Sequence, residues 1–480
     1  MKKNKQLLKG GILTALVALN APANALEKPQ TMEDMWKIIQ AQQKQIDEMK
    51  SGMQAQAAAA PAKTAASGDV KTLERKTDVL SQEVEKLRTN LSIPEEAKYK
   101  SAYGMGPAAS KVYSAGKGLS IGGYGEGNYS AKVGDKGSSN DSADMARMVL
   151  YAGYKFTDRI LFNSELEFEH ASTGEGSESK GEVSVEFASL DFFIDKRANV
   201  RAGLVLMPMG LVNRIHEPLF YFGNHRPEVE QRIIPSTWRE MGAGLFGAIT
   251  PELTYTAYVV NGLDATGFTS DGIREGRGGG SNAKAENFGY VARVDYDPTA
   301  LPGVTVGGSA YVGNSGQNQM FAGQKADVFT QLYEAHVQWK YRGLEFRTLG
   351  SWGHIGNADL VTAANIARNG PVDADHPNAG QIVGSQNYGF YTELGYDVLP
   401  LLWQDTTQYL APFFRYEKLN TMAKAPSGYA IDPTRDWQIY QVGLQYKPIP
   451  NVVIKADYRN YIAKQGQLPD DFNLGFGFIF

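Results

Sequence analysis

The stretch FNLGFGFIF, residues 472–480, alternates strictly between large apolar side chains and small or polar ones. The apolar positions are Phe472, Leu474, Phe476, Phe478 and Phe480. Successive side chains of a β-strand point to opposite faces of its sheet, so this spacing predicts a strand with one apolar face. An apolar strand at a free sheet edge in water promotes aggregation, whereas a closed barrel has no free edge.

The same alternation recurs from about Gly118 to the last residue. In ILFNSELEFEH, residues 160–170, one predicted face is apolar and the other carries Asn163, Glu165, Glu167 and Glu169. Sixteen such strands are predicted, and an even number closes an up-and-down antiparallel barrel with both ends on one side. Their predicted starts are residues 119, 145, 160, 182, 198, 241, 253, 287, 303, 328, 344, 386, 409, 436, 451 and 470.

Two features favour a membrane barrel over a soluble sandwich. Charged residues recur in the middle of the polar strand faces, and aromatic residues lie near strand ends, as in an interfacial girdle. The predicted connections are also unequal, because short turns alternate with long polar loops. The longest loops are predicted at residues 208–240, 264–286, 356–384 and 418–435. The final strand is expected to close against the first strand near Leu119 and Ile121, with its aromatic side chains facing lipid.

Composition excludes several other classes of protein. After residue 25 there is no apolar run of about 18 residues, which excludes a bundle of membrane-spanning helices. Residues 1–25 combine four lysines, an apolar middle and Ala23-Asn24-Ala25, which predicts a secretory signal peptide. Loss of those lysines lowers the formal net charge from -4 to -8, so no nucleic-acid partner is expected. With no cysteine, the chain has neither disulfides nor thiolate metal ligands.

The region after the signal has helical periodicity. Residues 26–53 form a predicted heptad helix segment, 54–69 an Ala-rich linker, 70–93 a coiled coil and 94–117 a second linker, before a barrel domain at 118–480. A narrow apolar stripe needs a partner, which favours self-association; the alternative is a single amphipathic helix on another surface. The segment is expected in the periplasm, where it would support trimerisation or contact peptidoglycan.

Several stretches carry a family resemblance. The signal, the alternating final strand and the terminal Phe480 resemble those of bacterial outer-membrane barrels. RAGLVLMPMG (201–210), IIPSTWREMGAGLFG (233–247) and GFYTELGYDVL (389–399) resemble the phosphate-selective porin O/P type, and within it the DcaP-like trimeric porins. The resemblance implies a homotrimer in the Gram-negative outer membrane, contacting its lipid. It also implies passive diffusion of small anionic solutes such as dicarboxylates.

The loop at 208–240 is the main candidate for selectivity. Its ionisable residues are Arg214, His216, Glu217, His225, Arg226, Glu228, Glu230, Arg232, Arg239 and Glu240. The resemblance implies that this third long loop folds into the channel, where its charges would form a constriction. The alternative is a loop that packs outside the barrel against a neighbouring subunit.

Strand phase adds lumenal cations to this set. Arg147, Arg201, Arg293, Arg347, Arg415 and Arg459 are predicted to face the lumen, with Lys340 and Lys455. A guanidinium binds carboxylate with two donors. The predicted solute-binding set therefore consists of these six arginines together with Arg214, Arg226, Arg232, Arg239, Glu217 and Glu230. The alternative is that each arginine pairs with a lumenal glutamate such as Glu165. No basic phosphate-trapping stretch is evident, so a dicarboxylate fits better than phosphate.

Other chemistries find little support. His170, His336 and His354 have no neighbouring serine in a hydrolase motif, and no enzyme activity is expected. DADHPN, residues 373–378, is read as a solvated turn, with a metal site as the alternative. No cofactor or metal is expected. The alternative function is a general porin that is nonspecific or permeable to carbohydrates.

Overall fold

The computed structural model describes residues 100–134, 140–173, 181–369, 381–403 and 405–480. The predicted signal peptide, both heptad segments, the Ala-rich linker and the turn at 373–378 lie outside these ranges. Among the described residues, no helix combines the length and the apolar character needed to cross a membrane.

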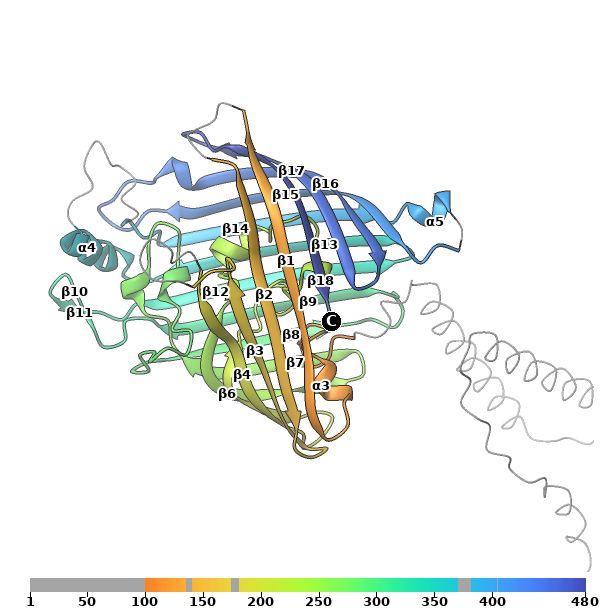
Figure 1. Cartoon of the computed structure of the whole chain (residues 1–480). Coiled ribbons are helices and arrows are strands. Elements are labelled where there is room, and N and C mark those ends of the chain that lie inside the picture. The colour runs from red at the N-terminus through yellow and green to blue at the C-terminus, as the bar shows by residue number, and fades with distance from the viewer. Residues whose placement is uncertain (1–99, 135–139, 174–180, 370–380, 404) are drawn as a thin grey trace, which may run out of the picture. The chain divides into compact units, whose positions relative to one another are not determined.

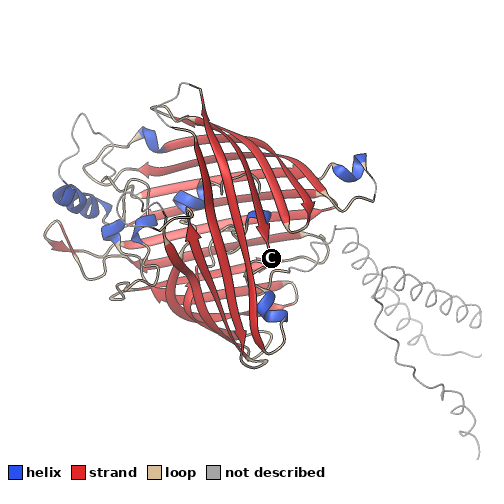
Figure 2. Ribbon diagram, in the orientation of Figure 1, coloured by secondary structure: helices blue, strands red, loops and turns tan. Residues whose placement is uncertain are grey.

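Sixteen antiparallel strands close into a barrel, as predicted (Figures 1 and 2). Each strand begins within three residues of its predicted start. Neighbours in the sequence are neighbours in the barrel, and β1 pairs with β18 to close it. The barrel strands are β1 (Gly118–Val133), β2 (Ser142–Lys155), β3 (Ile160–Glu169), β4 (Val183–Phe192), β5 (Asn199–Leu206), β6 (Arg239–Thr250), β7 (Leu253–Asn261), β8 (Phe288–Tyr296), β9 (Val304–Asn314), β12 (Phe329–Tyr341), β13 (Leu344–Ile355), β14 (Gln386–Tyr396), β15 (Tyr409–Lys424), β16 (Asp436–Ile449), β17 (Val452–Ala463) and β18 (Asp470–Ile479).

The helices and a small hairpin occupy the ends of the barrel and its loops. Helix α4 and the β10–β11 hairpin lie at one end of the barrel and α5 at the other (Figure 1). The prediction of a long loop at 418–435 is wrong at its start. Strand β15 continues to Lys424, and its pairing with β16 extends to the pair formed by Asn420 and Asp436. The remaining elements are α3 (Lys111–Ser114), η2 (Pro218–Phe220), η3 (Val229–Ile233), η4 (Ala265–Gly267), η5 (Arg274–Gly276), β10 (Met320–Phe321), β11 (Gln324–Lys325), α4 (Ala358–Asn369), α5 (Leu399–Leu402) and η6 (Pro433–Arg435).

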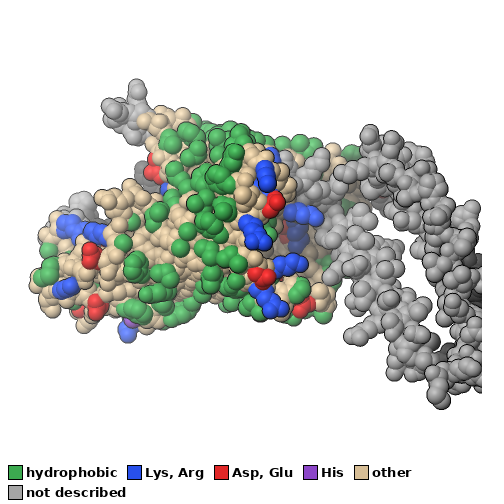
Figure 3. All heavy atoms as spheres, turned by 90° about the horizontal axis from the view of Figure 1, so that it is seen from below, with side chains coloured by type: hydrophobic (Ala, Val, Ile, Leu, Met, Phe, Trp, Pro, Cys, Tyr) green, Lys and Arg blue, Asp and Glu red, His purple; other side chains and the backbone are tan. Residues whose placement is uncertain are grey.

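The outer surface of the wall is apolar and the inner surface is polar. On β18, Phe472 and Leu474 are exposed on the outside, while Asn473 between them is fully buried on the inside. Hydrophobic side chains spread over the outer face of the strands, and charged ones gather toward its two ends (Figure 3). Such an exterior suits a bilayer, where a closed barrel satisfies every backbone hydrogen bond of the wall.

The register of closure differs from the prediction. Strand β18 pairs with residues 124–133 of β1, and the backbone N–H of Phe480 donates to the carbonyl of Gly123 at 2.9 Å. Leu119 and Ile121 lie beyond this pairing and face only β2. The predicted pairing of the last strand with the first is therefore confirmed, but its predicted position near Leu119 and Ile121 is wrong. The reason is the stagger between strands that barrel closure requires, which no single strand reveals.

Residues 100–117, the described part of the predicted linker, lie against inward-facing side chains of the wall. The side-chain amide of Asn163 on β3 donates to the carbonyl of Ala109 at 2.9 Å. The hydroxyl of Tyr113 donates to Asp191 on β4 at 2.9 Å. Met105, Ala108, Ala109 and Val112 are buried. Burial of this apolar surface accounts for order in a stretch that lacks strand or heptad periodicity.

Candidate functional site in the barrel lumen

The loop between β5 and β6, residues 207–238, crosses the interior of the barrel. The hydroxyl of Tyr221 donates to Glu126 on β1 at 2.5 Å. The backbone N–H of Asn224 donates to Asp457 on β17 at 2.8 Å, and that of Val229 donates to Glu417 on β15 at 3.1 Å. These strands are remote from β5 and β6 in the barrel order, so the loop reaches them through the lumen.

Asn213 holds the two ends of this loop together. Its side-chain Nδ2 donates to the carbonyl of Met207 at 2.7 Å, and its Oδ1 accepts from the backbone N–H of Trp238 at 2.6 Å. Trp238 is fully buried, and its ring makes an edge-on contact with Tyr311. The amide side chain thus supplements the backbone hydrogen bond of 2.9 Å from the N–H of Met207 to the carbonyl of Trp238, and it satisfies the other two backbone groups of this pair.

Glu230 fixes the middle of the loop. Its Oε2 accepts from the backbone N–H groups of Leu211 and Val212, each at 2.8 Å, and its Oε1 accepts from the hydroxyl of Tyr391 at 2.6 Å. Burial raises the pKa of this carboxyl group above its ordinary value. Glu230, predicted as solute-binding, is therefore engaged in holding the loop to β14.

Glu217 joins the loop to residues 100–117. Its Oε1 accepts from the backbone N–H of Ala108 at 2.9 Å and from that of Ala109 at 3.4 Å. Burial raises the pKa of Glu217 to about 8. The carboxyl group is thus mainly neutral at pH 7, and it serves as an acceptor between two inner segments.

Nine of the ten predicted arginines form ion pairs with carboxylates in the described part of the chain. Arg415 is fully buried and also donates to the backbone carbonyl of Phe222 at 2.6 Å. These pairs match the cross-paired alternative and connect the loop to the wall. The pairs are Arg147 with Glu126 and Glu167, Arg201 with Asp191, Arg214 with Asp295, Arg232 with Glu228 and Asp271, Arg239 with Glu186, Arg293 with Asp295 and Glu334, Arg347 with Glu345 and Glu393, Arg415 with Glu393 and Glu417, and Arg459 with Asp471 and Glu228.

Arg226 differs from the other nine. No ion pair joins it to a carboxylate within the described residues, and its Nε and Nη2 atoms are buried there without a hydrogen-bond acceptor. Burial, followed by the positive charge of Arg226, lowers the pKa of His216 to about 4. Arg226 is therefore a cation of the loop whose charge no described carboxylate neutralises by direct contact.

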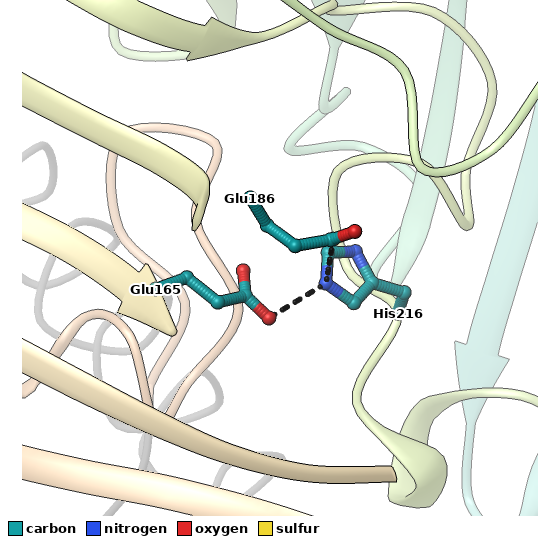
Figure 4. A group of neighbouring side chains, drawn as sticks. All are labelled: Glu165, Glu186 and His216. Carbon is teal, nitrogen blue, oxygen red and sulfur yellow. Dashed lines mark hydrogen bonds and ion pairs between the residues drawn. The ribbon is translucent and has the colours of Figure 1, made fainter. Parts of the chain in front are cut away.

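A cluster that the strand pattern did not predict lies beside Arg226. His216 Nε2 is 3.0 Å from Glu165 Oε1 and 3.4 Å from Glu186 Oε2 (Figure 4). Glu165 pairs with Phe187 in the ladder and the next residue, Leu166, pairs with Val185, so Glu186 is the extra residue of a β-bulge. Both Glu186 and Phe187 are buried. The sequence signal for this bulge was Glu186, an acidic residue that does not fit the alternation of its strand.

A cavity of about 600 Å³ lies in the lumen where residues 100–114 approach β6 and β7. Its lining includes Lys196 of the short β4–β5 turn and Ala248 of β6 near the β6–β7 turn, so it lies toward the end of the barrel that holds these turns. Four of its lining residues are basic: Lys100, Lys111, Lys196 and Arg214. None of the described residues that line it is acidic.

Comparison with known proteins places the chain in a family. No family model matches it. Over 377 residues it is 37% identical to a protein of Aquifex aeolicus (strain VF5) described as uncharacterized, and the match covers 78% of this chain and 82% of that protein. The chain belongs to the family of this protein. The family relationship shows common ancestry over most of the barrel, and it brings no described activity.

Solved structures show the fold to which this family belongs. OmpF of Salmonella typhi, in a complex with daunomycin, matches 75% of this chain and 97% of its own at 12% identity, with a TM-score of 0.50. The outer membrane channel DcaP of Acinetobacter baumannii matches the same shares at 14% identity, with a TM-score of 0.47. The likeness to OmpF shows a porin-type barrel.

Proposed function

We propose that this protein is an outer-membrane porin of the phosphate-selective O/P type, closest to the DcaP-like group, through which small anionic solutes such as dicarboxylates diffuse passively. In this proposal the β5–β6 loop forms the constriction, three copies assemble as a trimer, and the N-terminal segment lies in the periplasm. The observation that carries it is the basic cavity at the end of the lumen.

The cavity has the size and the charge for a small anion. Three lysines line about 600 Å³ of space together with Arg214, which is paired with Asp295, and no described lining residue is acidic. The apolar walls of a barrel in lipid focus the field of such charges into the aqueous space, which raises the local concentration of anions. Lys196 is exposed, so its charge is free to act on a solute.

Arg226 supplies a further positive charge inside the barrel. It lies on the loop that crosses the lumen, and no carboxylate is paired with it among the described residues. A guanidinium stays charged at every physiological pH and can donate two hydrogen bonds to one carboxylate. A dicarboxylate has one such group at each end, which suits a path that carries separate cationic positions.

Reversal potentials across a KCl gradient in planar bilayers test this proposal. We expect the wild-type channel to prefer anions, and the Lys196→Gln and Arg226→Gln variants to shift the reversal potential toward zero. Arg226→Lys is the matched control, because it keeps the positive charge at the same position. A wild-type channel with no anion preference would overturn the assignment of the solute and leave the barrel intact.

A general porin is the second candidate, and the nine paired arginines favour it. Because each faces a carboxylate, little of their charge remains to select a solute. Swelling of proteoliposomes in isotonic solutions separates the two functions. Equal rates for a neutral sugar and a dicarboxylate of similar size would support the general porin, and faster swelling in the dicarboxylate would support the anion channel.

A further inference from the structure

The ring of His216 faces two carboxylates with the nitrogen that carries no proton. Its Nδ1 lies 3.2 Å from the backbone carbonyl of Asn213, and a carbonyl can only accept a hydrogen bond. Nδ1 is therefore the protonated nitrogen of the neutral ring. The lone pair of Nε2 then points toward Glu165 Oε1 at 3.0 Å and Glu186 Oε2 at 3.4 Å.

Three facing acceptors repel one another unless a positive species lies among them. All three side chains are at least 98% buried, so water does not screen this repulsion. Glu165 Oε2 and Glu186 Oε2 also have no hydrogen-bond donor within the described residues. A cation bound between the three side chains would remove this repulsion.

We propose that Glu165, Glu186 and His216 bind one divalent transition-metal ion, with Zn²⁺ as the expected species. Their ligand atoms all lie within 4.8 Å of one another. A tetrahedral Zn²⁺ ion with bonds of about 2.1 Å has ligand atoms about 3.4 Å apart, close to the two observed separations. One imidazole and two carboxylates form a ligand set that this ion accepts.

The surroundings of the three ligands support the assignment. The bond from His216 Nδ1 to a backbone carbonyl is the usual outer contact of a metal-binding histidine, which it orients. Glu186 Oε1 accepts from Arg239 at 2.9 Å, which leaves Oε2 directed toward His216. His216 and Glu186 thus each have one atom held by the protein and one atom directed at the common centre, and Glu165 directs Oε1 at it (Figure 4).

His336 shows what a histidine without a metal looks like in the same lumen. Its Nδ1 lies 2.9 Å from Glu334 and its Nε2 lies 3.0 Å from Asp295. Arg293 Nη2 also lies 2.9 Å from His336 Nε2, and Arg293 pairs with both Asp295 and Glu334. The protein itself therefore supplies the positive charge among these groups, and no further cation is needed. His336 is therefore a matched control for His216.

Metal binding would connect the loop to the wall. Glu165 and Glu186 belong to adjacent strands, β3 and β4, and His216 belongs to the β5–β6 loop. An ion shared by all three would hold the loop across the lumen. This inference rests on the coordination geometry and does not depend on which solute the channel carries.

The test is metal binding by the full-length chain, refolded in detergent without metal and then titrated with Zn²⁺ and Co²⁺. We expect one Zn²⁺ per chain, and with Co²⁺ the visible absorption of a tetrahedral ion, which an aqueous octahedral ion lacks. His216→Gln, Glu165→Gln and Glu186→Gln should each weaken binding by at least about 10-fold. His336→Gln should bind as the wild type does.

Two outcomes would overturn the proposal. One is a wild-type chain, folded by its mobility on an unheated gel, that binds no Zn²⁺ and gives no tetrahedral Co²⁺ spectrum. The other is wild-type affinity in the ligand variants. Because the wild-type titration decides by itself, the proposal can fail even if every variant misfolds.

Discussion

Glu217 of the β5–β6 loop accepts a hydrogen bond of 2.9 Å from the backbone N–H of Ala108. The two residues come from separate parts of the chain that meet inside the barrel. Because Ala108 and Ala109 share this acceptor, one carboxyl group couples the loop to residues 100–117. The two inner segments are therefore expected to move together.

Replacing Glu217 tests this coupling. Glu217→Leu leaves the buried N–H of Ala108 without an acceptor, which costs about 1–3 kcal/mol. We expect larger fluctuations of single-channel current, because the loop and the segment separate more often. Glu217→Gln keeps an acceptor oxygen and matches the neutral state of the carboxyl group, so its current should resemble the wild type. Identical noise in the Leu and wild-type channels would contradict the coupling.

Gly395 tests the packing of the loop on β14. A Cβ atom at this inward position would collide with the ring of Phe222, which stacks on Phe413 with ring centroids 5.0 Å apart. We expect Gly395→Ala to destabilise the docked loop by about 1–3 kcal/mol, as overpacked sites do. The measurement is the rate of trypsin cleavage at Arg232. Gly350→Ala is the control, because a Cβ there meets only Phe390 at 4.0 Å; equal cleavage in both variants would refute the prediction.

The pKa of His225 predicts how the stability of the docked loop depends on pH. Burial, and then the charge of Arg459, lower the pKa of its ring to about 4. When the loop leaves its docked position, the ring of His225 has a pKa of about 6.5. The neutral ring of the docked loop therefore contributes stability that is fully present above pH 6.5 and is lost as the pH falls toward 4.

Hydrogen exchange of the loop measures this response. After correction for the intrinsic pH dependence of exchange, protection of backbone amides in residues 219–229 should be lower at pH 4.5 than at pH 7. His225→Gln keeps a donor for Asn473, which lies 3.1 Å from the ring, and does not titrate. Its protection should change little over the same range. The same loss of protection in both proteins would exclude His225 as the cause.

Leu474 tests the lipid-facing wall. It lies outward on β18 and is 48% exposed. Arginine at the middle of such a face costs about 2–4 kcal/mol, so Leu474→Arg should lower the free energy of unfolding from vesicles by that order. Denaturant titration followed by tryptophan fluorescence measures it. Leu474→Ala keeps the position apolar and should cost less; no difference between the two would argue against lipid contact here.

Local alternation predicted the wall well. The period of two in ILFNSELEFEH placed Glu165 and Glu167 inside and Phe168 outside, where the structure has them. The bulge at Glu186 escaped this reasoning, because one extra residue reverses the phase and its position depends on pairing with β3. Each strand was analysed by itself. That was sufficient to predict the strand boundaries, but a bulge depends on the pairing of two strands and was therefore missed.

By itself, the sequence determined a sixteen-stranded barrel with an apolar outside and a charged inside, since alternation is a local property that burial enforces at every strand. Only the tertiary structure decided what the inner charges do. Among the described residues, nine arginines have carboxylate partners and Arg226 has none, and Glu165, Glu186 and His216 come together from two strands and a loop. The stagger of the closed wall and the path of the loop set these distances, and both depend on all the strands at once.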